Sequence, residues 1–238
     1  MVTQLKLGAL AVDVVLKDIK NVHLSVHPPT GRVRIAAPPR TSLDTLRVFA
    51  ISKLGWIKKQ QKKLREQERE TPREYLDRES HYLWGKRYLL KVVEEDAAPR
   101  VELKHSTMIL RVRPGTNGAT KQDTVARWYR EQIRAAVPDL IGKLEPIIGV
   151  KVERVFVRRM KTKWGSCNAR TRTIRLNTDL ARKPVRCLEY VVVHELVHLL
   201  ERRHNDRFTA LMDRYLPHWR QFRKLLNTAP LGHEAWSY

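Results

Sequence analysis

The segment 191–200 is the feature that most constrains how this chain can fold. It is apolar except for His194, Glu195 and His198, and it follows Pro184, a residue type favoured at the first position of a helix. The run is far shorter than the ~20 apolar residues of a membrane span. A helix that is apolar on its other sides packs in a core, so we expect the three titratable side chains to line a cleft.

The order of these residues, His194-Glu-Leu-Val-His198, is an H-E-x-x-H motif. Four residues advance an α-helix by about 400°, so both imidazoles project from one face, about one turn apart, and can converge on a zinc ion. Glu195 lies ~100° further round, where it can contact zinc-bound water as a general base without being a ligand. The motif therefore predicts two zinc ligands and one catalytic base.

A catalytic zinc has three protein ligands and one open position, so one ligand must come from elsewhere in the chain. His204 is near enough in sequence, but in an uninterrupted helix it would lie ~15 Å along the axis from His194. This assignment requires a break between His198 and His204, and the Asn-Asp pair after His204 is typical of a new helix start. The other possible ligands are Glu201, Asp213, His218 and His233.

Such a centre predicts a hydrolase. Zinc lowers the pKa of bound water and polarises a carbonyl or phosphoryl oxygen, while a carboxylate such as Glu195 removes the water proton. Hydrolysis of peptide bonds is the first expectation for this motif. The residues nearby that could stabilise the oxyanion are Lys163, Tyr190, Arg207 and Tyr215.

Three blocks of sequence closely resemble the YgjP-like metallopeptidases, relatives of the SprT-like and Wss-type zinc proteases. They are Met-Lys-Thr-Lys-Trp-Gly-Ser-Cys at 160–167, Thr-Ile-Arg-Leu-Asn at 173–177, and the motif block 189–198 with His204 behind it. The resemblance implies an α+β, zincin-like metalloprotease domain. It also implies that His194, His198 and His204 are the zinc ligands and that Glu195 is the catalytic base.

The chain departs from that family pattern at Lys163, where an arginine is expected before Trp-Gly-Ser-Cys. Lysine keeps the positive charge but lacks the bidentate fork of arginine, which puts any anion clamp at this position in doubt. The Trp-Gly-Ser-Cys block either lines the cleft or packs beneath the metal-binding helix. In the first case the strand 173–178 offers an edge on which a peptide substrate can pair.

The rest of the chain predicts two regions with no internal repeat. Period-two alternation at 22–27 and 32–37 predicts a β-hairpin, and helical spacing with Ser42 as N-cap predicts a long basic helix over 42–70. Turn residues at 114–118 predict the boundary between a β-rich region, 1–118, and a zincin-like metallopeptidase domain, 119–238. The other predicted strands are 86–94, 101–113, 152–158 and 173–178, and the other helices are 121–144, 184–202, 206–215 and 218–226.

The chain is strongly basic. It has 47 Lys and Arg against 25 Asp and Glu, a net charge of +22, and twelve of the basic residues lie within 151–186. Such a charge attracts polyanions, so a zinc peptidase recruited to DNA or to an acidic partner is the leading hypothesis. The alternatives are a metal-dependent nucleoside triphosphate pyrophosphohydrolase and a non-enzymatic nucleic-acid-binding module with structural zinc. Glu195 argues against the last, since structural zinc sites are closed by four ligands.

The cysteine pattern and the apolar runs indicate a cytoplasmic protein. Cys167 and Cys187 form no C-x-x-C pair, which suits a reducing compartment and excludes a disulfide framework. The sequence has neither a transmembrane segment nor a convincing secretory signal. We therefore expect a protein or peptide substrate, a possible DNA partner and no membrane partner.

Overall fold

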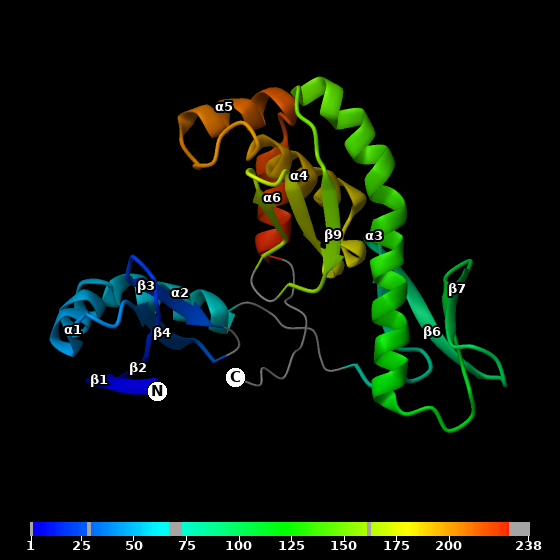
Figure 1. The fold of residues 1–238 in the computed structure, drawn as a ribbon. Helices are drawn as coiled ribbons and strands as arrows, with labels where there is room; N and C mark the ends of the chain where they lie inside the picture. Colours follow the sequence, from blue (N-terminus) through cyan, green and yellow to red (C-terminus); the bar gives the residue numbers. More distant parts are fainter. Residues whose placement is uncertain (1, 28–29, 67–72, 161–162, 229–238) are drawn as a thin grey trace. The chain divides into compact units, whose positions relative to one another are not determined.

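The computed structural model describes residues 2–27, 30–66, 73–160 and 163–228, in two compact units (Figure 1). The contacts divide the chain between Thr71 and Pro72, whereas the sequence predicts a boundary at 118. The reason lies in the core of the second unit. Leu90 and Leu110, from strands before residue 118, belong to the same hydrophobic cluster as Ile133 and Val192 after it. These strands and the helix that carries the H-E-x-x-H motif are therefore parts of one unit.

The first unit is a four-stranded sheet with two helices. The buried side chains of the sheet and the helices form a core of their own, which includes Val33, Ile35, Leu46, Ala50 and Ile57. The sheet has the order β1-β2-β4-β3, and its last two strands are the predicted hairpin. The elements are β1 (Val2–Leu7), β2 (Leu10–Leu16), β3 (His23–His27), β4 (Arg32–Ala37), α1 (Leu43–Ser52) and α2 (Leu54–Glu66).

The predicted long helix is two helices in the structure. Ser42 is the N-cap as expected, since its side chain accepts a hydrogen bond from the Thr45 amide. The first helix ends at Lys53, whose amide bonds to the carbonyls of Ala50 and Ile51, and the second starts at once. Gly55 lowers the helix propensity at this point, which the apolar spacing does not register. Residues 67–70 of the prediction lie outside the described part.

The second unit begins with another four-stranded sheet, of order β5-β6-β8-β7. Its strands are β5 (Ser80–Leu83), β6 (Lys86–Glu94), β7 (Arg100–Lys104) and β8 (Thr107–Val112). The prediction of β6 is confirmed. The single strand predicted over 101–113 is instead the hairpin β7–β8, because the chain turns at His105, whose φ is 55°.

The two four-stranded sheets have the same topology, so the structure contains a repeat that the sequence analysis missed. In each sheet the first two strands are antiparallel, the second pairs in parallel with the fourth, and the fourth pairs antiparallel with the third. In each case a helix follows the fourth strand. The same strand order can form from unrelated side chains, because it requires only alternating apolar and polar residues and suitable turns. A repeat of the fold therefore need not appear as a repeat of the sequence.

The part of the second unit that follows this sheet begins with one long helix, α3 (Gly118–Ile148), which continues through Pro138. Its first part lies beside β7 and β8 and its last part beside β9 (Figure 1). A three-stranded sheet of order β10-β11-β9 follows, then the helices that carry the motif. These elements are β9 (Arg154–Arg158), β10 (Gly165–Asn168), β11 (Thr173–Asn177), the 3-10 helix η1 (Thr178–Arg182), α4 (Val185–Val197), α5 (Asp206–Tyr215) and α6 (Trp219–Thr228).

In the described part of the chain, no helix has both the length and the apolar character needed to cross a membrane.

Candidate metal centre

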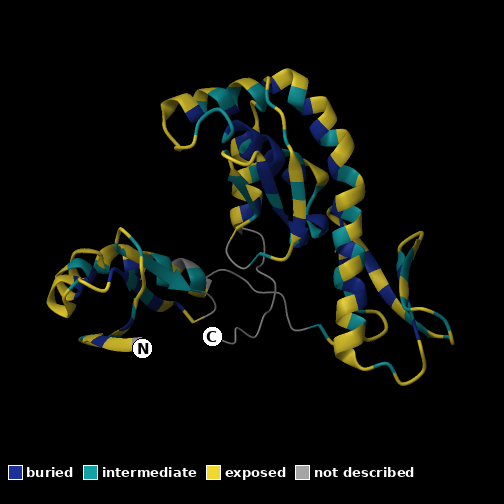
Figure 2. Cartoon of the chain, viewed as in Figure 1, coloured by how far each residue is buried: buried dark blue, intermediate teal, exposed yellow. Residues whose placement is uncertain are grey.

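Helix α4, which carries the motif, is the most deeply buried helix of the second unit (Figure 2). It packs against α3, β10, β11, α5 and α6. Leu188, Val192 and Leu196 are fully buried in this packing. His194 and His198 are only partly buried, because they project from α4 into a cleft. The sequence-based expectation of an apolar helix with a polar cleft face is thus what the structure has.

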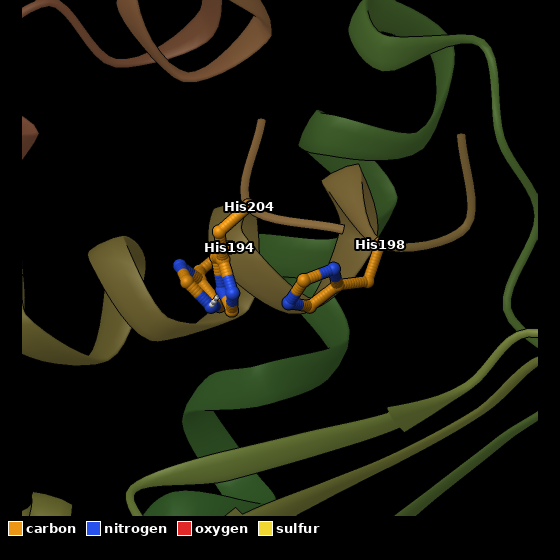
Figure 3. Close-up of side chains that lie close together, drawn as sticks. All are labelled: His194, His198 and His204. Atoms are coloured by element: carbon orange, nitrogen blue, oxygen red, sulfur yellow. Dashed lines mark hydrogen bonds between the residues drawn. The ribbon is translucent and has the colours of Figure 1, made fainter. Parts of the chain in front are cut away.

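The helix is interrupted between His198 and His204, as the assignment of His204 as a ligand requires. The last residue of α4 is Val197, and α5 starts at Asp206 with Asn205 as its N-cap, whose side chain accepts a hydrogen bond from the Phe208 amide. The turn between the helices brings His204 back over α4, and the three imidazoles point toward one another (Figure 3). Candidate ligand atoms of the three histidines all lie within 4.8 Å of one another.

The arrangement of the ring nitrogens fits a divalent metal. His204 Nε2 lies 3.1 Å from His194 Nε2. Two imidazoles on a tetrahedral zinc, with Zn–N bonds of about 2.0–2.1 Å, hold their ligating nitrogens about 3.3 Å apart. His198 Nδ1 lies 3.0 Å from the Glu201 carbonyl, so it can donate there and leave the Nε2 lone pair free for a metal.

The histidines are held in the form that binds metals. Burial lowers the pKa of His194 to about 3, and the charges of His198, His204 and Arg223 act in the same direction. The pKa of His204 is also lowered, first by burial and then by His198 and Arg223. Both imidazoles are therefore neutral at neutral pH, and neutral imidazole is the ligand for zinc.

Glu195 lies next to the triad and is 5% exposed. Burial raises the pKa of its carboxyl to about 8, and the positive charge of Lys163 partly opposes that rise. Strand β10 passes very close to this side chain at Gly165. A Cβ atom added there would lie 2.6 Å from Glu195 Oε1 and 2.8 Å from Val191 Cγ1. Only glycine allows this approach, which gives the Gly of the Trp-Gly-Ser-Cys block a physical role.

The cleft in front of the triad has a volume of 790 Å³. All four residues of the Trp-Gly-Ser-Cys block line it, so the first of the two interpretations of that block is correct. Cys167 is one of them, and burial followed by the Glu195 charge raises the pKa of its thiol to about 11. The other lining residues are Lys163, Asn168, Ala169, Arg170, Arg175, Tyr190, Val191, His194, Glu195, His198, Arg202 and His204.

The other possible third ligands lie outside the cluster or have other partners. Glu201 Oε1 accepts a hydrogen bond from the Arg203 amide, and the Asp213 carboxylate accepts from Trp219 Nε1 and from Arg220. His218 is exposed and does not belong to the histidine cluster. His233 lies outside the described residues.

Of the four possible oxyanion donors, Tyr190 and Lys163 line the cleft. The Tyr190 ring lies edge-on to that of His194, with centroids 5.8 Å apart, and burial raises the pKa of its hydroxyl. Tyr215 and Arg207 do not line the cleft. The sequence analysis missed Arg170, Arg175 and Arg202 as cleft residues. The basic stretch 151–186 was a signal for the first two, but nothing in the sequence places their side chains.

Three converging imidazoles, a buried carboxylate and a broad cleft form an arrangement that could hold a metal ion. Residues 20–229 match the family described as YgjP-like, metallopeptidase domain, and the chain belongs to this family. It is therefore a metallopeptidase, and its family implies a divalent metal, typically zinc, and a protein or peptide substrate.

Solved structures that resemble the chain include two archaeal metallopeptidase zymogens. The abylysin zymogen of Pyrococcus abyssi is 22% identical with a TM-score of 0.36, over 39% of this chain and 92% of that one. The jannalysin zymogen of Methanocaldococcus jannaschii is 20% identical with a TM-score of 0.34, over 37% and 90%. No curated protein matches the chain.

Proposed function

We propose that this metallopeptidase is a zinc enzyme in which His194, His198 and His204 hold the metal and Glu195 is the catalytic base. The observation that carries the proposal is the convergence of three imidazoles across a helix break, beside a buried carboxylate. A divalent metal held by three residues keeps a position open, as catalytic rather than structural zinc sites do.

Zinc held there would polarise the scissile carbonyl and acidify a water molecule. Glu195 would accept the proton of that water on its carboxylate and return it to the leaving amine. Gly165 keeps the side chain of Glu195 in place, because β10 packs directly against it. The His198–Glu201 contact orients the second imidazole in the same way.

Strand β10 would bind the substrate. It is at the edge of the sheet β10-β11-β9, and all its residues line the cleft. The prediction that the strand 173–178 offers this edge is wrong, because β11 is the central strand and pairs with both β10 and β9. The second edge of β10 pairs with no other strand of the described chain. An extended peptide can add to such an edge through backbone hydrogen bonds, which positions its carbonyl without selecting side chains.

We also infer that the positive charge of the protein recruits it to DNA or another polyanion in the cytoplasm. The net charge of +22 supports the recruitment, and the two free thiols, Cys167 and Cys187, support a reducing compartment. Cleavage of an unfolded protein should then accelerate when single-stranded DNA is added, and the acceleration should decline with salt. An unchanged rate would contradict recruitment.

The central test compares zinc content and peptidase activity in three variants. Glu195→Gln should bind one zinc per chain and lose activity by at least ~100-fold, because the proton acceptor is removed. His204→Ala should lose both zinc and activity. The matched control, His218→Ala, changes an exposed histidine outside the cluster and should keep both.

An active Glu195→Gln variant, or a His204→Ala variant that still binds zinc with full affinity, would contradict the assignment. Nucleoside triphosphates should be assayed in parallel. Turnover of triphosphates alone, lost in Glu195→Gln, would assign the same centre to a pyrophosphohydrolase.

A further inference from the structure

We propose that the cleft selects peptide segments with acidic side chains next to the scissile bond. The inference rests on the proposed peptidase function, and it goes further by naming the class of substrate. It follows from the charges that line the cleft.

Four cations line the cleft against a single carboxylate. Lys163, Arg170, Arg175 and Arg202 supply the positive charges, and Glu195 is the one acidic lining residue. None of the four cations forms an ion pair with a described residue. The Arg175 guanidinium instead lies 6.0 Å from the centroid of the Phe156 ring. The cleft therefore keeps an excess of positive charge that no ion pair with a described residue neutralises.

Several arginines elsewhere in the same unit are paired. Arg111 bonds to Glu95 and Glu102, Arg186 bonds to Glu189, and Arg220 bonds to Asp213. Unpaired like charges repel one another and give no stability in return. Their concentration at the cleft thus points to an anionic ligand rather than to the folding of the unit.

The cations come from two parts of the cleft lining, the strands and the turn after α4. Lys163 precedes β10, Arg170 is in the turn between β10 and β11, and Arg175 is in β11, all on the strand side. Arg202 lies in the turn between α4 and α5, on the side of the metal ligands. A peptide paired along β10 would lie in the same cleft as these cations, so acidic residues near the scissile bond are favoured.

The expected selectivity is moderate. Ion pairs near solvent each improve binding by a factor of up to about 5, and a cleft with low-dielectric walls increases their effect. Two or three such contacts give a preference of about 10-fold in kcat/KM for an acidic over a neutral peptide. The preference should decline with salt, because the contacts are partly open to solvent.

The test uses the full-length zinc-loaded protein and quenched fluorescent peptides that differ only by Glu or Gln next to the scissile bond. Wild type should cleave the Glu peptides about 10-fold faster in kcat/KM. Arg175→Gln and Arg202→Gln should each lose a factor of about 3 on Glu peptides and almost nothing on Gln peptides. Arg127→Gln, a matched control on the exposed face of α3 outside the cleft, should behave as wild type.

The possible outcomes distinguish a failure of the acidic selectivity from a failure of the proposed peptidase function. Equal cleavage of Glu and Gln peptides by wild type, or a preference that survives in the Arg175→Gln/Arg202→Gln double variant, would overturn the acidic selectivity and leave the peptidase intact. Zinc-loaded protein that cleaves neither peptide but hydrolyses triphosphates would overturn both and assign the cations to phosphate. Thermal unfolding of each variant should nearly match wild type, since none of the substituted side chains forms an ion pair with a described residue and only Arg175 contacts a ring, that of Phe156.

Discussion

The sheet β1–β4 and the sheet β5–β8 share one strand order, but the helices behind them differ. The first sheet is followed by α1 and α2, which have 10 and 13 residues and belong to the first unit. The second is followed by α3, a single helix of 31 residues. The same strand order therefore occurs twice, and the two sheets differ in the length of the helix that follows them.

Helix α3 packs in one hydrophobic core with both the second sheet and α4, the helix that carries the H-E-x-x-H motif. Val125, Tyr129 and Ile133 in its first half and Ile141 and Leu144 further along all belong to one core cluster. The same cluster contains strand residues such as Leu110 and the catalytic-helix residue Val192. The core of β1–β4 is a separate cluster. Of the two four-stranded sheets, only β5–β8 shares a hydrophobic core with α4, the helix that carries two histidines of the candidate metal centre.

The largest expected effect comes from equivalent cavities in the two cores. Leu110→Ala in β8 and Ile35→Ala in β4 each remove a fully buried side chain from the same position of the two sheets, the strand that is fourth along the chain and third in the strand order. Each should lower the free energy of unfolding of its own unit by about 2–5 kcal/mol. Only Leu110→Ala should also weaken zinc retention, because its core is shared with α4.

Hydrogen exchange measured by peptide, together with zinc content, checks this pair. Ile35→Ala should speed exchange in the first unit and leave 73–228 unchanged. Loss of zinc in Ile35→Ala would break the comparison, since it would show that the first copy also supports the centre.

Sequence reasoning could predict what depends on local pattern. The hairpin β3–β4, strand β6, helix α5 and the motif on α4 follow from alternation, helical spacing and capping residues. It could not predict the parallel pairs β2–β4 and β6–β8, because non-local pairing leaves no local signal. Residue 118 was taken as a boundary because Pro and Gly mark turns, but a turn does not show which core the next helix joins.

The second-largest expected effect is a pH dependence of the free energy of unfolding of the second unit, which contains the sheet β5–β8. His81 in β5 is fully buried among Arg73, Glu79 and Arg182, and burial lowers its pKa from 6.5 to about 4. Below pH 6.5 the unfolded chain binds a proton that the folded unit does not, so stability falls as the pH is lowered from 6.5 to 4. The loss should be about 3 kcal/mol for the second unit.

His81→Leu should flatten this pH dependence, whereas His105→Asn, at an exposed turn of the same sheet, should retain it. Urea unfolding between pH 4 and 7 measures both. An equal slope in wild type and His81→Leu would assign the acid sensitivity to other groups.

The smallest effect compares the first hairpin turn of each sheet. Gly8 and Gly85 both have positive φ, 61° and 80°, so an alanine at either position is strained by about 1 kcal/mol. A Cβ on Gly8 would meet no atom within 4 Å, but one on Gly85 would lie 3.0 Å from Cγ and 3.3 Å from Cα of Pro184. Gly85→Ala should thus cost about 1 kcal/mol more than Gly8→Ala, through crowding at the start of α4. Unfolding of each unit followed by hydrogen exchange measures the two losses, and equal losses would mean that the β5–β6 turn does not brace the catalytic helix.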